Sequence, residues 1–73
     1  MGGRMKIKKD EVVIVNHSRS GKWLGKATED FDTDMDGFYP IVLDSEMARG
    51  MSKVWYKGDD MPARKELCKI SRQ

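Results

Sequence analysis

The stretch that decides the fold is a predicted β-hairpin over residues 11–28: Glu-Val-Val-Ile-Val-Asn-His, then Ser-Arg-Ser-Gly, then Lys-Trp-Leu-Gly-Lys-Ala-Thr. The β-branched run in its first third is too short for a helix and predicts a strand covered on both faces near its middle. The next four residues predict a turn in which Gly21 takes a positive φ. Residues 22–28 alternate imperfectly and form the second arm, with a bulge or bend expected at Gly25.

The rest of the chain predicts shorter elements. A polar loop over 29–37 leads into a strand over 38–43, where Pro40 removes one ladder donor and therefore favours a sheet edge. The remaining expectations are one helical turn over 44–50, a strand over 51–57 and a turn over 58–62.

The C-terminal segment 60–71 has two interpretations. Ala63, Leu67 and Ile70 have helical spacing, whereas Cys68 and Ile70 would share one face of a strand. We favour a short helical turn near Pro62 followed by a fifth strand, and keep a helix as the alternative.

Five short strands predict a mainly β fold, a small five-stranded SH3-like or OB-like barrel with one or two short helical turns. Closure into a barrel would also remove the exposed edges of so small a sheet. Residues 1–8 are expected to be a flexible N-terminal segment, and residues 9–71 a single SH3-like β domain.

Residues 9–28 resemble the start of KOW-type, SH3-like domains. The similarity lies in the charged entry Lys9-Asp10-Glu11, the β-branched strand, and the arm Gly21-Lys22-Trp23-Leu24-Gly25-Lys26-Ala27. The glycine that usually precedes the first strand of that family is missing here. The resemblance implies binding of RNA or protein partners. The whole chain is also similar in style to small uncharacterised bacteriophage-encoded proteins, which implies no activity.

Composition limits the class of protein. The chain has 73 residues, enough for one domain, and a single cysteine, Cys68, so no internal disulfide can form. No run approaches the length of a membrane span, and the N-terminal basic residues are not followed by the apolar run of a signal peptide. We expect a cytoplasmic protein without a membrane partner. For its oligomeric state, we favour a monomer over an oligomer.

The charge is distributed unevenly. The net charge is +2, but residues 29–46 carry seven acids and no bases, so the rest has fourteen bases against five acids. The acidic loop contains four aspartates at alternate positions: Asp30, Asp32, Asp34 and Asp36. The segment 32–37 matches the start of a calcium-binding loop, but the position for the bidentate glutamate is Leu43. Weak Ca²⁺ binding by Asp32, Asp34 and Asp36 is therefore one hypothesis, and a solvated loop is the alternative.

Basic and aromatic residues alternate along the predicted hairpins. The candidate binding residues are Arg19, Lys22, Trp23, Lys26, Lys53, Trp55 and Tyr56. Such a face could contact a protein partner, or hold phosphates on its cations and stack bases on its rings. The alternative is that both tryptophans belong to the core and the lysines to the solvated side of each strand.

We expect no catalysis, cofactor or zinc site. His17 lies in a turn beside Ser18 and Ser20 with no acid nearby to orient it. Zinc needs three or four histidine or cysteine ligands, and the chain has only His17 and Cys68. The sequence therefore predicts a non-catalytic binding module for a protein partner, with RNA or single-stranded DNA as the alternative ligand.

Overall fold

The chain is mainly β in a computed structural model that describes residues 4–50 and 52–73. In chain order, the elements are β1 (Lys6–Ile7), β2 (Val12–His17), β3 (Gly21–Ala27), β4 (Phe31–Asp32), β5 (Ile41–Leu43), β6 (Met47–Arg49), β7 (Val54–Tyr56), the 3₁₀ turn η1 (Lys65–Leu67) and β8 (Cys68–Arg72).

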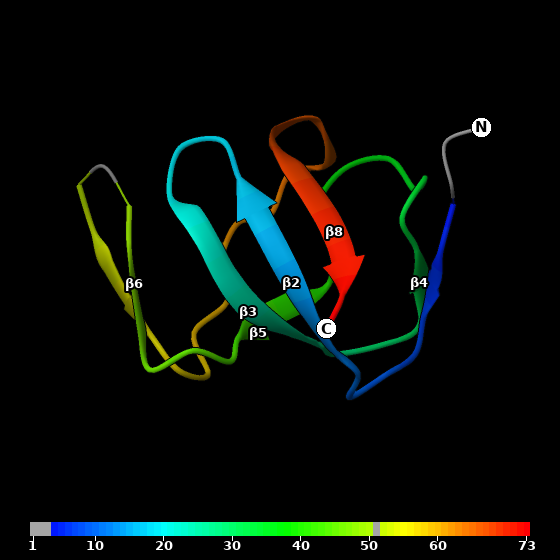
Figure 1. The fold of residues 1–73 in the computed structure, drawn as a ribbon, viewed down its shortest axis with the longest axis horizontal. Helices are drawn as coiled ribbons and strands as arrows, with labels where there is room; N and C mark the ends of the chain where they lie inside the picture. Colours follow the sequence, from blue (N-terminus) through cyan, green and yellow to red (C-terminus); the bar gives the residue numbers. More distant parts are fainter. Residues whose placement is uncertain (1–3, 51) are drawn as a thin grey trace.

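The predicted hairpin is confirmed and forms the centre of the largest sheet. This antiparallel sheet has four strands in the order β5-β3-β2-β8 (Figure 1). In the β2–β3 register, Val15 lies opposite Trp23 and Val13 opposite Gly25. Gly21 has a φ of 82°, the left-handed conformation expected of a glycine in this turn. Gly25 continues the β2–β3 register without a bulge.

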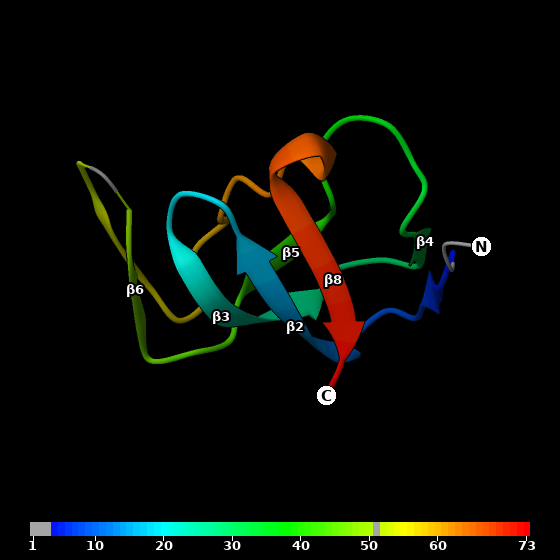
Figure 2. The ribbon, with the colours of Figure 1, turned by 45° about the horizontal axis from the view of Figure 1, so that its top comes forward.

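The β-branched run is covered on one face only, so the expectation of two buried faces is wrong. Val13 and Val15 are fully buried, whereas Val12 and Ile14 are half-buried on the opposite face. No segment crosses in front of β2, β3 and β8 in either view (Figures 1 and 2). An antiparallel sheet can solvate one face in this way, and the period of two then decides which side chains are buried.

The predicted closed barrel is not found. Among the described residues, β1 pairs only with β4, and β6 only with β7, giving separate two-stranded sheets. These pairs lie at opposite ends of the long axis, with the four-stranded sheet between them (Figure 1). Because neither pair joins the ladder of the main sheet, β5 and β8 stay at its edges and the sheets do not close.

The core lies on the inner face of the main sheet and extends under both flanking pairs. Its buried side chains are Ile7, Val13, Val15, Trp23, Ala27, Phe31, Tyr39, Ile41, Leu43, Ala48, Met61, Ala63 and Cys68.

The expectation of a flexible segment up to residue 8 is wrong for its described part. Ile7 is fully buried and pairs with Phe31, and the Met5 amide donates to Thr33 Oγ1 at 2.9 Å. Burying one isoleucine therefore brings this segment into the domain. Residues 1–3 lie outside the described part.

The middle of the chain differs most from its prediction. The expected strand 38–43 is reduced to β5, and Phe38 forms only an isolated bridge with Arg64. The helical turn expected over 44–50 is absent, because Ser45 Oγ accepts from the Leu24 amide and the Asp44 amide donates to the Leu24 carbonyl. These bonds extend the edge of the sheet. The chain then forms β6, which pairs with β7.

Segment 51–57 contributes only β7, and Met51 lies outside the described residues. The favoured interpretation of the C-terminal segment is confirmed, since the 3₁₀ turn η1 is followed directly by β8. The turn begins three residues after Pro62. β8 then pairs with β2 and places Cys68 and Ile70 on the core side.

Candidate binding cleft

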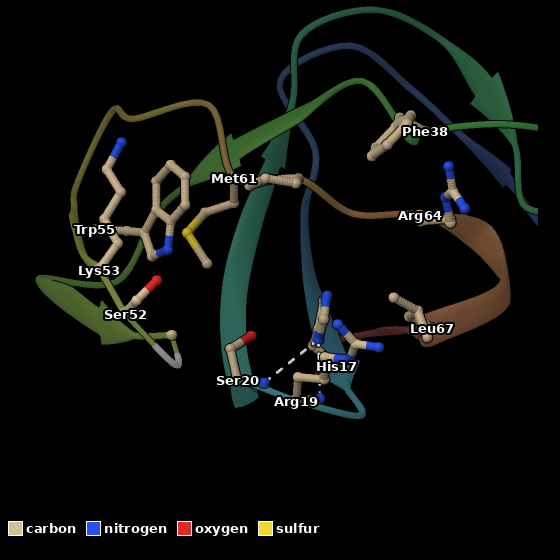
Figure 3. Close-up of a pocket in the computed structure, with 12 residues that line it drawn as sticks. His17, Arg19, Ser20, Phe38, Ser52, Lys53, Trp55, Met61, Arg64 and Leu67 are labelled. Carbon is tan, nitrogen blue, oxygen red and sulfur yellow. Dashed lines mark hydrogen bonds between the residues drawn. The ribbon is translucent and has the colours of Figure 1, made fainter.

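A cleft of about 440 Å³ opens where the β2–β3 turn, the β6–β7 hairpin and segment 61–67 meet (Figure 3). Its lining residues come from distant parts of the sequence, between His17 and Leu67. They are His17, Arg19, Ser20, Phe38, Gly50, Ser52, Lys53, Trp55, Met61, Pro62, Arg64 and Leu67.

The β2–β3 turn is held by the His17 side chain. His17 Nδ1 accepts hydrogen bonds from the backbone amides of Arg19 at 3.0 Å and Ser20 at 3.3 Å. Burial, and secondarily the charge of Arg19, lowers the pKa of His17 and favours the neutral ring. A neutral imidazole that accepts at Nδ1 carries its proton on Nε2. Figure 3 shows that this second nitrogen points into the cleft.

The opposite wall comes from the β6–β7 hairpin. Trp55 is half-buried and lies across from Ala48 in the ladder. The Lys53 ammonium lies over the indole, 4.1 Å from the ring centroid, a cation–π contact. The Gly50 amide donates to the Lys53 carbonyl at 2.8 Å and closes the hairpin near its tip. This wall therefore presents the Trp55 ring, one face of which is covered by the Lys53 ammonium.

The third side of the cleft pairs an aromatic ring with an arginine. The Arg64 guanidinium lies 5.3 Å from the centroid of Phe38, whose side chain is 52% exposed. Arg64 Nε also lies 3.9 Å from Glu66, which is outside the lining. Phe38 is one of the few large exposed apolar side chains, and it lies at the cleft.

The charge of the cleft has one sign. Among the residues that the structure describes, Arg19, Lys53 and Arg64 line it, and no carboxylate does. Within the described part of the chain, Arg19 and Lys53 take part in no ion pair. A concave site whose charged groups are all cations concentrates positive potential and attracts an anionic group.

The structure brings together only three of the seven predicted binding residues: Arg19, Lys53 and Trp55. Trp23 is 3% exposed and its Nε1 donates to Ser20 Oγ, so it belongs to the core and supports the turn from beneath. Tyr56 is 58% exposed on the face of the hairpin opposite Trp55.

Lys22 and Lys26 lie on the open face of the main sheet, outside the cleft. They are exposed and lie opposite Asn16 and Val12 in the β2–β3 register. They therefore do not extend the cationic lining of the cleft.

Phe38 and Arg64 are not among the site residues predicted from the sequence, and His17 is predicted only as an ordinary turn residue. Phe38 was expected inside a strand, and nothing in the sequence pairs it with a residue 26 positions away. The sequence does contain a signal for the structural role of His17, because a histidine followed by Ser-Arg-Ser-Gly can accept hydrogen bonds from the backbone amides of the turn.

The carboxylates of the acidic loop diverge. Asp30 Oδ1 accepts from the Lys9 amide at 2.7 Å, Asp34 lies 3.6 Å from Arg4, and Asp36 lies 3.9 Å from Lys65. Over residues 4–50 and 52–73, no group of three or more acidic, histidine or cysteine side chains is placed to hold a metal ion. The predicted Ca²⁺ site over Asp32, Asp34 and Asp36 therefore has no matching geometry.

Neither the Cys68 thiol nor the His17 ring is set up as a reactive nucleophile or base. Burial raises the pKa of the Cys68 thiol to about 11, so the thiol is protonated near neutral pH. His17 uses Nδ1 for the backbone of its own turn. The side chains that line the cleft are instead mostly hydrogen-bond donors and apolar groups, among them two aromatic rings.

Comparison with known proteins finds no matching family model, no matching curated protein and no matching solved structure. Among the described residues, no helix has the length and apolar character needed to cross a membrane. The KOW-type resemblance of residues 9–28 stays a prediction.

Proposed function

We propose that the chain is a non-catalytic protein-interaction module whose cleft holds a short extended segment of a protein partner. The observation that carries the proposal is the lining of the cleft, whose described residues include two aromatic rings and three cations and no carboxylate. Its volume lies in the range of about 300–1,000 Å³ that is typical of small-ligand sites. Apolar walls with a few polar groups suit an extended peptide whose side chains alternate between apolar and polar.

Nucleic acid is the weaker candidate because the predicted row of stacking rings is broken. Trp23 is buried, and Tyr56 lies on the other face of its hairpin. The rings left at the cleft, Trp55 and Phe38, each carry a cation of this chain on one face. Stacking successive bases requires open faces along one groove.

The acidic loop also opposes a long polyanion. Asp36 pairs with Lys65, which follows the cleft residue Arg64, and the Lys65 amide donates to the Gly37 carbonyl. The Asp36 carboxylate therefore lies close to the Phe38–Arg64 end of the cleft. A phosphate backbone running out of the cleft at this end would meet negative charge, whereas a short peptide segment would not reach it.

A peptide array scored for binding to the labelled protein tests the proposal. We expect extended peptides to bind, binding to be lost in Trp55→Ala and retained in Tyr56→Ala, because only Trp55 faces the cleft. A single-stranded oligonucleotide is the competing probe. Salt-sensitive quenching of Trp55 fluorescence by the oligonucleotide, with no peptide bound, would assign the cleft to nucleic acid.

We also propose a cytoplasmic, monomeric protein. Cys68 is free and buried, which suits a reducing compartment. The proposal of an SH3-like relationship rests on the resemblance in the β2–β3 hairpin, and the proposal of a bacteriophage origin rests on the similar style of the whole chain.

A further inference from the structure

Most of the polar side chains that line the cleft are hydrogen-bond donors. Arg19, Lys53 and Arg64 can only donate. Ser20 Oγ accepts from Trp23 Nε1 at 3.0 Å, which leaves its hydroxyl proton to donate and one lone pair that can accept. Ser52 is the other hydroxyl among the described lining residues, and a hydroxyl can donate or accept.

His17 adds a donor without adding a charge. Because its Nδ1 accepts from two backbone amides, its Nε2 carries the proton and faces the cleft (Figure 3). The same two bonds fix the ring, so the Nε2–H is held in place before any ligand arrives. Arg19, two residues further along, lines the same side of the cleft.

A ligand that satisfies these donors must offer several acceptor lone pairs in a small volume. A carboxylate has two oxygens with about four acceptor positions, and it forms strong paired hydrogen bonds with arginine. An amide offers one acceptor oxygen, and its NH₂ group would meet donors. The cleft should therefore discriminate between a glutamate and a glutamine at the same place in a peptide.

We infer that the cleft selects a carboxylate on the bound segment, and that His17 Nε2–H, with the neighbouring cations, recognises it. The inference rests on the proposed function and adds the chemical class of the ligand. The apolar neighbours of that carboxylate in the peptide would lie against Trp55 and Met61, which occupy the other side of the cleft (Figure 3).

Three synthetic hexapeptides test the inference. The first is acetylated and amidated Ser-Leu-Glu-Pro-Leu-Ser, the second has glutamine for glutamate, and the third is the glutamine peptide with a free C-terminal carboxylate. Binding is followed by NMR through the backbone amides of Arg19 and Ser20, at an ionic strength of about 0.15 M so that long-range attraction is screened. We expect the glutamate peptide to bind about tenfold more tightly than the blocked glutamine peptide, a difference of roughly 1.4 kcal/mol.

Two substitutions of His17 separate its two roles. In His17→Asn, the side-chain oxygen can accept from the turn amides as Nδ1 does, but the distal donor is lost. In His17→Gln, the amide nitrogen can take the place of Nε2, but the acceptor for the turn is lost. We expect His17→Asn to keep the fold and reduce the glutamate preference to about twofold, and His17→Gln to retain more of the preference at lower stability.

The outcomes separate the inference from the function on which it rests. Equal binding of the blocked glutamate and glutamine peptides would overturn carboxylate selection while peptide binding stands. An unchanged preference in His17→Asn would overturn the role of His17. Tighter binding of the third peptide than of its blocked form would support carboxylate selection with the chain terminus as the source. If none of the peptides shifts the cleft amides, both the inference and the peptide function are wrong.

Discussion

The two hairpins that face each other across the cleft are built in opposite ways. The β2–β3 hairpin is paired on both sides, by β8 and β5, and buries Val13, Val15 and Trp23. The β6–β7 hairpin has three residues in each strand and, in the part of the chain that the structure describes, no further strand beside it. A two-stranded hairpin alone is marginally stable in water.

The β6–β7 hairpin is therefore held by a few tertiary contacts. Trp55 packs against the core, Ala48 is buried, and the Gly58 amide donates to the Leu43 carbonyl at 2.8 Å. Its other face leaves Met47 and Tyr56 exposed. One wall of the cleft therefore belongs to the core, whereas the other can adjust with little loss of global stability.

The two tryptophans give the largest expected contrast. Trp23→Ala should lower the free energy of unfolding by about 3–5 kcal/mol, because it empties a buried ring site. A domain of this size has a total stability of roughly 4–11 kcal/mol, so this variant should be largely unfolded on warming. Trp55→Ala should cost only about 1–2 kcal/mol, because the ring is half-buried. Urea denaturation followed by circular dichroism measures both, and equal losses would show that the β6–β7 hairpin is as integral as β2–β3.

Two glycines give the next contrast. A Cβ at Gly25 would lie 3.1 Å from Val15 Cγ2, 3.2 Å from Ile41 Cδ1 and 3.3 Å from Trp23 Cζ3. Because all three atoms are in the packed core, Gly25→Ala should cost about 1–3 kcal/mol.

Gly50→Ala is the matched control. Its Cβ would lie 3.2 Å from Trp55 Nε1, in a hairpin that can move, and the loss of glycine entropy in the unfolded chain offsets the contact by about 0.4–1 kcal/mol. We expect a net change near zero in the same denaturation experiment. A loss at Gly50 as large as at Gly25 would contradict an adjustable wall.

The same contrast explains what the sequence could predict. The β2–β3 hairpin was predictable because its local signals agree: a β-branched run, a turn with a glycine, and an alternating second arm. The β6–β7 hairpin was not, because a Ser-Glu-Met-Ala-Arg-Gly stretch also favours one helical turn. Its strand conformation depends on the Leu24–Ser45 hydrogen bond, which joins residues 21 apart.

The candidate site was predictable only in part, for a related reason. Composition and alternation pointed to Arg19, Lys53 and Trp55, but they could not show which face each residue takes. Tyr56 follows Trp55 and points the other way, and Trp23 is in the core. Closing the cleft with Phe38 and Arg64 depends on a long-range bridge that no local pattern encodes.

Acid should affect the β2–β3 side of the cleft selectively. The pKa of His17 is lowered from its ordinary value of 6.5, chiefly by burial, so the folded state favours the neutral ring. The stability that the neutral His17 ring contributes is fully present above pH 6.5 and is lost as the pH falls through the lowered pKa of His17. We expect the free energy of unfolding to decrease by less than in either tryptophan variant. The His17→Asn variant should lose this pH dependence.

Glu11 provides the internal control for this pH dependence. Its pKa is lowered from 4.5, first by the Lys8 amide and then by Arg72, so its contribution is lost only as the pH falls through its lowered value. Denaturation midpoints measured from pH 7 to pH 3 should therefore fall in two steps. A single step below pH 4.5, unchanged in His17→Asn, would show that the turn does not depend on the neutral histidine.

The smallest effect is expected on the outer face of the β6–β7 hairpin. Met47 and Tyr56 lie opposite each other in the ladder and are 47% and 58% exposed. Met47→Ser and Tyr56→Ser should change the free energy of unfolding by no more than about 0.5 kcal/mol, since exposed side chains away from packed sites contribute little. Urea denaturation at low and high protein concentration checks this. A loss that grows with concentration would mean that a second copy covers this face, so that the hairpin's stability comes from another molecule and the contrast with β2–β3 holds only for the monomer.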